Sequence, residues 1–501
     1  MMLGEQNRMA GASALGRTSV THPLQIAEVR AKDGYGRIGI TFCPGKKQAH
    51  AFTGSWDRDL CVDLDAVRQW GPVLVVTLIE QHELDSLQVP TLEEEVRRRH
   101  MDWLHLPIPD YGVPPEAFER RWNEVGEGIR ARLRDGFDVL VHCKGGLGRA
   151  GTITARLLVE CGMPPDQAIR TVRKVRPGAI ETGGQEDHVR RQVEISERKP
   201  ATDPDAIRDR AHGALLGLAV GDAVGTTLEF KPRDSYPPIT DMVGGGPFRR
   251  KPGGWTDDTA MALALAESLV AHPGLDERDL MARFTDWYRN GAYSCVGVCD
   301  DIGITTSQAL ARWERTGEPL AGSTDPQQAG NGSLMRLAPV ALRWWHDRAK
   351  LRDVAARQSR TTHGAPEAVD ACIVYAEMLA DAIAGRLRSR VLHRPATALA
   401  GNIAAIAAGS WRGKRRGDIQ ATGYVAHALE ASLWCIGRTG DFRSAVLTAA
   451  NLGQDADTTA AITGQLAGAL YGASGIPAPW RERVAWAERI HDLADRLITF
   501  P

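Results

Sequence analysis

The stretch VLVHCKGGLGRAGT, residues 139–152, joins a short apolar segment to a helix-like one through a glycine-rich loop. The valines and leucine before the loop are typical of a buried strand. Glycines let backbone N–H groups turn inward to bind an anion, and the N-terminal end of a helix favours the same negative charge. Arg149 adds a planar fork for two phosphate oxygens, and these charges favour the nucleophilic thiolate form of Cys143. We therefore predict a phosphate-binding loop above Cys143, built from Lys144, Gly145, Gly146, Leu147 and Gly148.

Around this stretch, strand-like and helix-like segments alternate over residues 20–198. Short apolar runs at 73–79, 103–108 and 138–143 predict buried strands, and residues 115–136 have a helical pattern. This alternation predicts an α/β domain with a mostly parallel sheet flanked by helices.

Composition limits the class of protein. The chain has 501 residues, 43% of them hydrophobic and 25% charged, with a net charge of −1, so the whole chain has no field that attracts nucleic acid or an anionic membrane. Its eight cysteines include no C-x-x-C pair, which disfavours zinc ribbons and disulfide frameworks. We see no signal peptide and no run long enough to span a membrane, and we expect a cytoplasmic protein with a disordered N-terminus over residues 1–19.

The second half differs in character. After a polar linker at 199–205, residues 206–501 are rich in alanine and leucine with helical periodicity, which predicts one all-α domain. Gly464, Gly468 and Gly472 are four residues apart and predict close packing between helices. Two glycine-rich loops, at 242–255 and 329–334, interrupt the pattern, and such loops are often functional.

Three acidic groups stand out in this half. Asp222 and Glu229 form the first. The second is Thr256, Asp257, Asp258 and Thr259, and the third is Asp455, Asp457, Thr458 and Thr459. Each of the last two precedes a helix-like run, so helix capping is the simpler interpretation. A cap needs only one oxygen, however, and clustered carboxylates with threonines suit magnesium, manganese or calcium better than zinc.

The first half resembles the cysteine-dependent tyrosine and dual-specificity phosphatases, most closely those of the kinase-associated type, on HCKGGLGR and HLPIPDYGVPP. The resemblance implies that Cys143 attacks phosphorus, Arg149 holds the phosphate oxygens and Asp110 is the general acid, with no cofactor. Ala150 departs from this family, which usually has serine or threonine after the arginine. We therefore expect slow hydrolysis of the phosphocysteine.

Residues 206–475 resemble the ADP-ribosylglycohydrolases, the family of the dinitrogenase reductase-activating glycohydrolase. Five motifs occur in order: GALLGLAVGDAVGTTLEF, GGWTDDTAMALALAESL, GNGSLMRLAPVAL, TTHGAPEAVDA and NLGQDADTTAAITGQLAGALYG. The resemblance implies an all-helical fold with two Mg²⁺ or Mn²⁺ ions. Its metal ligands would be Thr256, Asp257, Asp258, Asp455, Asp457 and Thr458.

The same resemblance places other residues around the substrate. Glu229 would approach the metals or the bound water, and Asp301, which has Asp300 beside it, would help to open or protonate the ribose. Gly330, Asn331 and Gly332 would contact the diphosphate and ribose, and His363 would lie near the adenosine.

Together these features predict a bifunctional hydrolase that removes ADP-ribose and phosphate. Its expected substrates are an ADP-ribosylated protein or small ADP-ribose conjugate and a phosphorylated molecule, with no membrane partner. Arginine, serine, phosphate and nucleobase acceptors all remain open, and a nucleic-acid substrate is not indicated. The alternative is a protein that binds ADP-ribose without cleaving it and carries an impaired phosphatase-like domain.

Overall fold

The structure, a computed structural model, describes residues 16–51, 54–395 and 398–500. It divides into two compact units, residues 1–126 with 136–196 and residues 127–135 with 197–501. Residues 1–15 of the segment predicted to be disordered lie outside the described residues. In the remainder of that segment, the backbone N–H of Arg17 donates to Ser55 O at 2.8 Å. Within the described ranges, no helix has the length and apolar character needed to cross a membrane.

The first unit contains a five-stranded sheet in the order β1-β2-β7-β5-β6. Its strands are β1 (Ala27–Arg30), β2 (Arg37–Phe42), β5 (Leu74–Thr77), β6 (Asp102–His105) and β7 (Val139–Cys143). The pairs β2–β7, β7–β5 and β5–β6 are parallel. At the edge of the sheet, β1 pairs with β2 in the antiparallel direction. The predicted mostly parallel sheet is therefore present, with β5, β6 and β7 at the three predicted strand positions.

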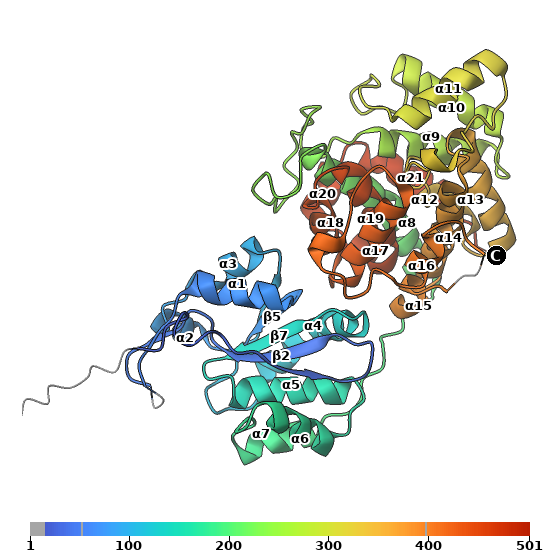
Figure 1. The fold of residues 1–501 in the computed structure, drawn as a ribbon. Coiled ribbons are helices and arrows are strands. Elements are labelled where there is room, and N and C mark those ends of the chain that lie inside the picture. Colours follow the sequence, from blue (N-terminus) through green and yellow to red (C-terminus); the bar gives the residue numbers. More distant parts are fainter. Residues whose placement is uncertain (1–15, 52–53, 396–397, 501) are drawn as a thin grey trace, which may run out of the picture. The chain divides into compact units, whose positions relative to one another are not determined.

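Helices cover both faces of this sheet. They are α1 (Leu60–Trp70), α2 (Gln81–Ser86), α3 (Leu92–Arg98), α4 (Glu116–Arg134), α5 (Gly148–Glu160), α6 (Pro165–Val175) and α7 (Gly183–Arg190). Figure 1 shows α1 and α3 on one side of the sheet and α5, α6 and α7 on the other. A separate short ribbon pairs β3 (Lys47–Gln48) with β4 (Trp56–Asp57).

Strand β7 lies in the middle of the sheet, and all five of its residues are buried. Because helices cover both faces, the strand begins with three consecutive apolar residues, Val139–Val141, rather than alternating. It ends at Cys143, and α5 begins at Gly148. The central strand and the first turn of α5 thus fix both ends of the glycine-rich loop at the carboxyl edge of the sheet, where α/β folds bind ligands.

The second unit is helical, and in its described part we find isolated bridges but no strand. Its α-helices are α8 (Pro204–Gly225), α9 (Asp257–Ala271), α10 (Glu277–Asn290), α11 (Ile304–Thr316), α12 (Ala338–Trp344), α13 (Arg348–Thr362), α14 (Pro366–Ile383), α15 (Arg388–Leu392), α16 (Ile403–Ala407), α17 (Val425–Gly437), α18 (Phe442–Ala450), α19 (Ala456–Tyr471), α20 (Ala478–Arg483) and α21 (Ala487–Leu497). Helix α8 begins two residues before the predicted domain start, with Asp203 as its N-cap.

Glycines let α8 and α19 pack unusually close together. A methyl group added at Gly464 of α19 would lie 2.0 Å from Gly217 O of α8, and one at Gly468 would lie 1.8 Å from Gly213 O. The predicted helix packing at these two glycines is therefore present. Gly472 also lies against α8, because a methyl group added there would lie 1.9 Å from Asp209 Oδ2, and in addition it ends α19 with a positive φ of 77°.

This contact predicts that Gly464→Ala strongly destabilises the second unit. The new methyl group would require two backbones to separate, and overpacking of this kind costs about 1–3 kcal/mol and occasionally more. Gly417 provides the matched control, because a methyl group added there would have no atom within 4 Å. Urea unfolding followed by circular dichroism should show a lower unfolding midpoint for Gly464→Ala than for wild type. The midpoint of Gly417→Ala should be close to that of wild type. Equal midpoints for the two variants would contradict the packing argument.

Candidate active sites

The glycine-rich loop of the first unit turns its carbonyl groups outward. Lys144 O accepts hydrogen bonds from Cys43 N at 3.5 Å and from Lys46 Nζ at 3.3 Å. Arg176 donates to Gly145 O at 3.1 Å and to Gly146 O at 3.0 Å. With the carbonyls held on the outside, backbone N–H groups remain for the centre, and Gly146 N donates to Cys143 Sγ at 3.2 Å. The loop therefore has the inward-facing donors that an anion site needs.

Only glycine fits at position 146. Its φ is +69°, and a methyl group there would lie 2.5 Å from the backbone carbon of Thr41 in β2. This close approach lets the loop fold down onto the end of the sheet. It also keeps the Cys143 side chain, which is 3% exposed, at the bottom of the loop.

Arg149 is held by a carboxylate that the sequence did not reveal. Its Nη1 donates to Glu83 Oε2 at 2.6 Å and its Nη2 to Glu83 Oε1 at 3.0 Å, and Nη1 also donates to Ile108 O at 2.9 Å. Both side chains are almost fully buried. Burial would raise the pKa of Glu83, but the hydrogen bonds from Arg149 hold this pKa below its ordinary value. Glu83 therefore remains charged and fixes the plane of the guanidinium group.

The predicted general acid lies beside Arg149. Asp110 Oδ1 is 2.9 Å from Arg149 Nη2, although the Asp110 side chain is 49% exposed. The loop that carries Asp110 is tied to α7, because Gln185 Nε2 donates to Gly112 O at 3.1 Å. The structure thus brings Cys143, Arg149 and Asp110 into one site from three separate segments.

Lys46 is a second residue that the sequence analysis missed. Its ammonium group is buried and lies 4.2 Å from the centroid of the Trp56 ring, in addition to its bond with Lys144 O. Burial lowers the pKa of Lys46 to about 8, against the opposing influence of the Cys43 and Cys143 thiols. A thiolate at Cys143 would stabilise this buried positive charge, and Lys46 would stabilise the thiolate in return.

His142 is neutral and points away from the loop's anion site. Its Nε2 lies 2.7 Å from Thr77 Oγ1, and burial lowers the pKa of His142 to about 3. The residue therefore links β7 to β5 as an uncharged hydrogen-bonding group.

The acidic residues of the second unit meet at the ends of several helices. Asp257 and Asp258 open α9, and Asp457 lies in the first turn of α19. Glu229 follows the 3₁₀ turn Thr226–Leu228, and Asp301 precedes α11. The sequence separates these residues by up to 228 positions, whereas the fold places them together.

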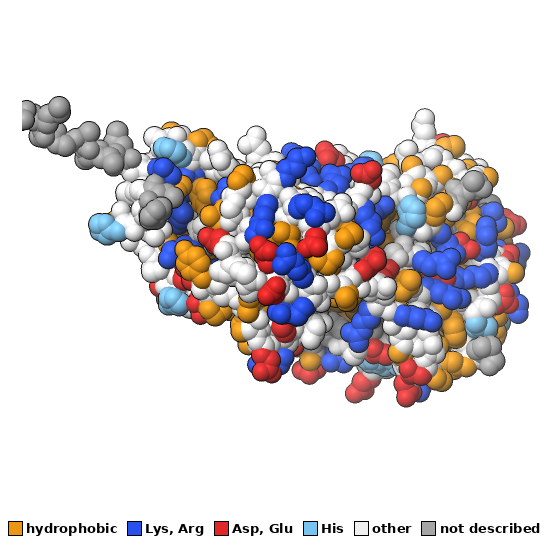
Figure 2. Space-filling model, turned by 90° about the horizontal axis from the view of Figure 1, so that it is seen from below, with side chains coloured by type: hydrophobic (Ala, Val, Ile, Leu, Met, Phe, Trp, Pro, Cys, Tyr) orange, Lys and Arg blue, Asp and Glu red, His pale blue; other side chains and the backbone are white. Residues whose placement is uncertain are grey.

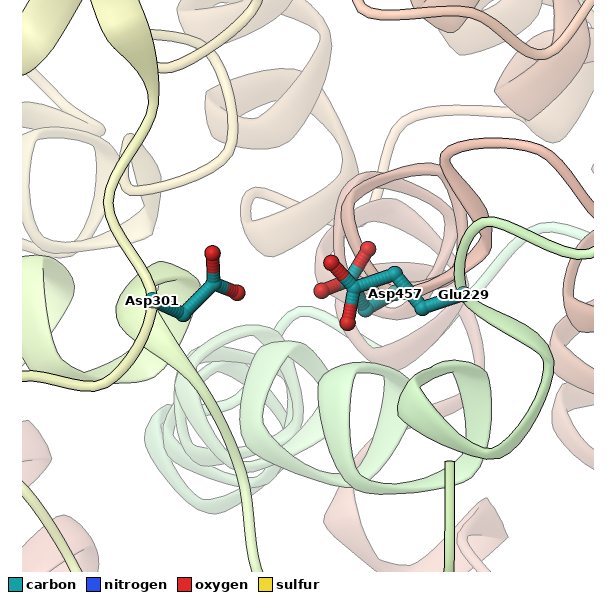
Figure 3. A group of neighbouring side chains, drawn as sticks. All are labelled: Glu229, Asp301 and Asp457. Carbon is teal, nitrogen blue, oxygen red and sulfur yellow. The ribbon is translucent and has the colours of Figure 1, made fainter. Parts of the chain in front are cut away.

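Two overlapping groups of carboxylates form the acidic centre. Oxygens of Glu229, Asp301 and Asp457 lie within 4.8 Å of one another, and so do oxygens of Asp257, Asp258 and Asp457. Figure 3 shows Asp301 facing Asp457 and Glu229 from the opposite side. Asp457 belongs to both groups, so the arrangement offers two neighbouring oxygen sites that share one ligand.

These carboxylates lack a cationic side chain. Among the described residues, no lysine or arginine forms an ion pair with any of the five. Burial, followed by the charges of neighbouring carboxylates, raises the pKa values of Asp257, Asp258 and Asp457 well above their ordinary range. Within the described part of the chain, Glu229 Oε2 and Asp258 Oδ1 are buried and have no hydrogen-bond partner. Such a set of oxygens fits hard divalent cations.

Asp222 holds the acidic centre together without facing it. Its two oxygens accept hydrogen bonds from the backbone N–H and hydroxyl groups of Thr256 and Thr259 at 2.6–3.1 Å. The carboxylate of α8 thus caps the start of α9 and orients the next two aspartates. The sequence analysis noted Asp222 but gave it no role, because its partners lie 34 and 37 positions away.

The two threonines and Asp455 surround the centre. Thr256 Oγ1 is 3.2 Å from Asp457 Oδ2, and Thr458 Oγ1 is 3.4 Å from Asp258 Oδ2. Asp455 belongs to neither carboxylate group, and its Oδ2 accepts a hydrogen bond from Asn331 Nδ2 at 2.6 Å. The glycine-rich loop at 329–334 is thereby joined to the start of α19.

The neighbouring aspartates 300 and 301 have different surroundings. Asp300 Oδ1 accepts a hydrogen bond from Arg250 Nη2 at 2.6 Å, whereas Asp301 faces the acidic centre. Burial, followed by the charge of Asp222, raises the pKa of Asp301 to about 7. The geometry therefore distinguishes two residues that the sequence left ambiguous.

His363 packs against the glycine-rich loop at 329–334. The His363 side chain is almost completely buried, and methyl groups added at Gly330 and Gly332 would both lie 3.1 Å from its Nε2. Burial lowers the pKa of His363 to about 3, so the ring is neutral. In this structure the histidine packs against the loop residues rather than lying open to solvent.

The Arg149–Glu83 contact predicts that Glu83→Gln impairs phosphate-monoester hydrolysis. An amide cannot accept both guanidinium hydrogen bonds, so Arg149 would lose its fixed orientation. We expect kcat/KM for para-nitrophenyl phosphate to fall at least tenfold, which corresponds to about 1.4 kcal/mol of transition-state stabilisation. Glu94→Gln, at an exposed position that pairs with Arg98, is the control and should retain full activity. Equal rates for both variants would exclude this role of Glu83.

Comparisons with known proteins agree with this division of the chain. The family model for ADP-ribosylglycohydrolase matches residues 203–500. The model described as Swiss Army Knife protein, DSP-PTPase phosphatase domain, matches residues 62–189. Nothing in these comparisons favours a protein that only binds ADP-ribose.

Individual relatives match one half or the other. ADP-ribosylarginine hydrolase Tri1 of Pseudomonas putida is 47% identical over 294 residues, covering 59% of this chain and 79% of the relative. A solved structure described as an ADP-ribosylglycohydrolase-related protein complex is 41% identical with a TM-score of 0.52, covering 58% of this chain and 97% of that chain. Cyclin-dependent kinase inhibitor 3 of Rattus norvegicus is 33% identical over 128 residues, covering 25% of this chain and 59% of the relative. The chain therefore belongs to the ADP-ribosylglycohydrolase family and carries, in addition, an N-terminal phosphatase domain of the dual-specificity type, so that it is a bifunctional hydrolase.

Proposed function

We propose that the second unit cleaves the bond between ADP-ribose and an arginine side chain, using two Mg²⁺ or Mn²⁺ ions. The observation that carries this proposal is the acidic centre, in which five carboxylates converge and no described lysine or arginine forms an ion pair with them. The choice of arginine follows from the relative that is an ADP-ribosylarginine hydrolase. In this proposal, residues 206–501 are the glycohydrolase domain, 20–198 the phosphatase domain and 199–205 the linker, in a cytoplasmic protein.

The proposed ligands are those that face the centre or border it: Thr256, Asp257, Asp258, Asp455, Asp457 and Thr458. Bound cations would hold ribose hydroxyl groups, orient a water molecule and stabilise developing negative charge. Glu229 would accept a proton from the attacking water, and Asp301, on the opposite side, would contact the ribose (Figure 3). The Gly330–Gly332 backbone would hold the diphosphate, with Asn331 fixing Asp455 and His363 supporting the loop.

A panel of substrates tests the proposed acceptor. With Mn²⁺ present, the full chain should release ADP-ribose from ADP-ribosylarginine at least 100-fold faster than from ADP-ribosylserine, O-acetyl-ADP-ribose or ADP-ribosylated nucleic acid. Asp457→Asn should abolish this release, whereas Asp492→Asn, at an exposed site far along the chain, should leave it unchanged. Faster release from any other acceptor would refute arginine specificity but keep the glycohydrolase activity.

Cation binding should also be visible without catalysis. Because a ligand that binds only the folded state stabilises it by RT ln(1 + [L]/Kd), Mn²⁺ at 100 times its Kd should add about 2.7 kcal/mol. We expect the thermal unfolding midpoint of wild type to rise with Mn²⁺ and that of Asp258→Asn/Asp457→Asn to respond little. EDTA should reverse the rise. If the double variant gains as much stability as wild type, cations bind elsewhere.

We propose that the first unit hydrolyses a phosphate monoester in two steps. The Cys143 thiolate attacks phosphorus, the bond to the leaving oxygen breaks, and Asp110 donates a proton to that oxygen. Water then attacks phosphorus and gives a proton to the Asp110 carboxylate, and the phosphorus–sulfur bond breaks to release phosphate and the Cys143 thiolate. Arg149 and the loop N–H groups hold the phosphate oxygens in both steps. A cavity of about 590 Å³ beside Lys144, bordered by Lys47, His50 and Trp56, has room for the remainder of the substrate.

The second step depends on the residue after Arg149. Ala150 is fully buried. The hydroxyl group two residues later in α5, Thr152 Oγ1, donates a hydrogen bond to the backbone oxygen of Gly148 at 2.7 Å. Thr152 therefore does not replace the missing serine. We predict that Ala150→Ser raises the steady-state rate of para-nitrophenyl phosphate hydrolysis and lowers the amount of phosphocysteine trapped by acid quench. An unchanged steady-state rate would show that phosphocysteine hydrolysis does not limit turnover.

A further inference from the structure

The second unit has a cavity of about 540 Å³ that shares no residue with the acidic centre. It lies between the start of α13 and the segment that follows α14, and we call it the arginine cavity. Its charged and titratable lining residues are Arg348, Arg386, Arg390, Arg394, His393 and Asp381. Four arginines therefore face one aspartate around a space large enough for a small ligand.

Two of the arginines are anchored. Asp381 bonds to both Arg348 and Arg394, one with each carboxylate oxygen. Behind them, Glu377 Oε2 accepts a hydrogen bond from Arg394 Nε at 3.0 Å, and Glu377 O accepts one from Arg348 Nη1 at 3.0 Å. The carboxylates hold these two guanidinium groups in place, which lowers the entropy cost of binding an anion.

The other two arginines are unpaired. Arg386 and Arg390 are exposed, and neither forms an ion pair with any carboxylate in the described part of the chain. His393, also exposed, borders the same space. The available carboxylates are used by the anchored pair, so the cavity keeps an excess of positive charge that an anion would neutralise.

The surface around this region is basic as well. Figure 2 views the molecule from below, the side on which α15 and α16 lie in Figure 1, and Lys and Arg side chains gather over that end of the second unit. An anionic ligand would thus meet a favourable field before it reaches the cavity.

We propose that the arginine cavity is a binding site for a small ligand with two linked phosphate groups, separate from both catalytic sites. Guanidinium forks match phosphate oxygens in pairs, and the anchored and unpaired arginines provide one pair for each phosphate. The volume exceeds what a single phosphate fills, and the lining is too polar for an apolar ligand. Occupancy would join α13 to the segment after α14 and stabilise this part of the unit.

Calorimetric titration of the full chain with sodium pyrophosphate, in EDTA and about 0.15 M salt, tests the proposal. The test variant is Arg386→Gln/Arg390→Gln, which removes the unpaired arginines and leaves the anchored pair intact. The control is Arg170→Gln/Arg315→Gln, which removes the same charge from exposed positions elsewhere. Pyrophosphate bound by the phosphatase loop would be retained in both variants, so the difference between them isolates the arginine cavity.

We expect wild type and the control variant to bind pyrophosphate at a site where the test variant binds it at least tenfold more weakly. Glycohydrolase activity should be unchanged in all three proteins. Orthophosphate should bind this site at least tenfold more weakly than pyrophosphate. Equal binding by test variant and control would overturn the proposal. So would equal affinity for the two anions, or tighter binding of a single-stranded oligonucleotide, which would indicate a nucleic-acid backbone instead.

Discussion

The acidic centre depends on how closely α8 and α19 approach each other. The contact runs from Gly213 beside Gly468 to Gly225, where a methyl group would lie 2.5 Å from the Asp457 Cα. Because the two helices are in backbone contact along this length, the end of α8 and the start of α19 cannot move independently. Asp222 on α8 then fixes the start of α9 through Thr256 and Thr259. One helix contact thus sets the positions of three of the five carboxylates.

Such a centre costs stability when no cation is bound. Buried carboxylates that repel one another favour the neutral state, as the raised pKa values of Asp257, Asp258 and Asp457 show. The rest of the unit must offset this cost, and its long, almost fully buried helices provide the apolar contacts to do so. Rigid packing and unfavourable charge are therefore two parts of one arrangement, in which the scaffold holds ligands that would otherwise separate.

Sequence reasoning succeeded where the information is local. The loop after Cys143, the strand before it and the helix start after it lie within residues 139–152, and the acidic motifs stand at helix starts. It failed where a contact joins distant segments. Glu83 is one of several glutamates in polar helices, and nothing in its neighbourhood indicates that it meets Arg149, 66 positions later. The glycine row of α8 was also overlooked, although its spacing of four repeats that of α19, because its meaning depends on the partner helix.

The hydrogen bonds of Arg149 show how its guanidinium group can contact both a bound phosphate and the general acid, Asp110. Glu83 occupies one edge of the guanidinium fork through Nη1 and Nη2, and Ile108 O takes the second bond of Nη1. The edge formed by Nε and Nη2 remains for a phosphate, yet Asp110 lies 2.9 Å from Nη2. A bound phosphate must therefore displace the Asp110 carboxylate from this nitrogen. Displacement would leave the Asp110 carboxyl group next to the phosphate, where a general acid has to reach the leaving oxygen. The loop tether at Gly112 would keep the released carboxyl group within reach of the leaving oxygen.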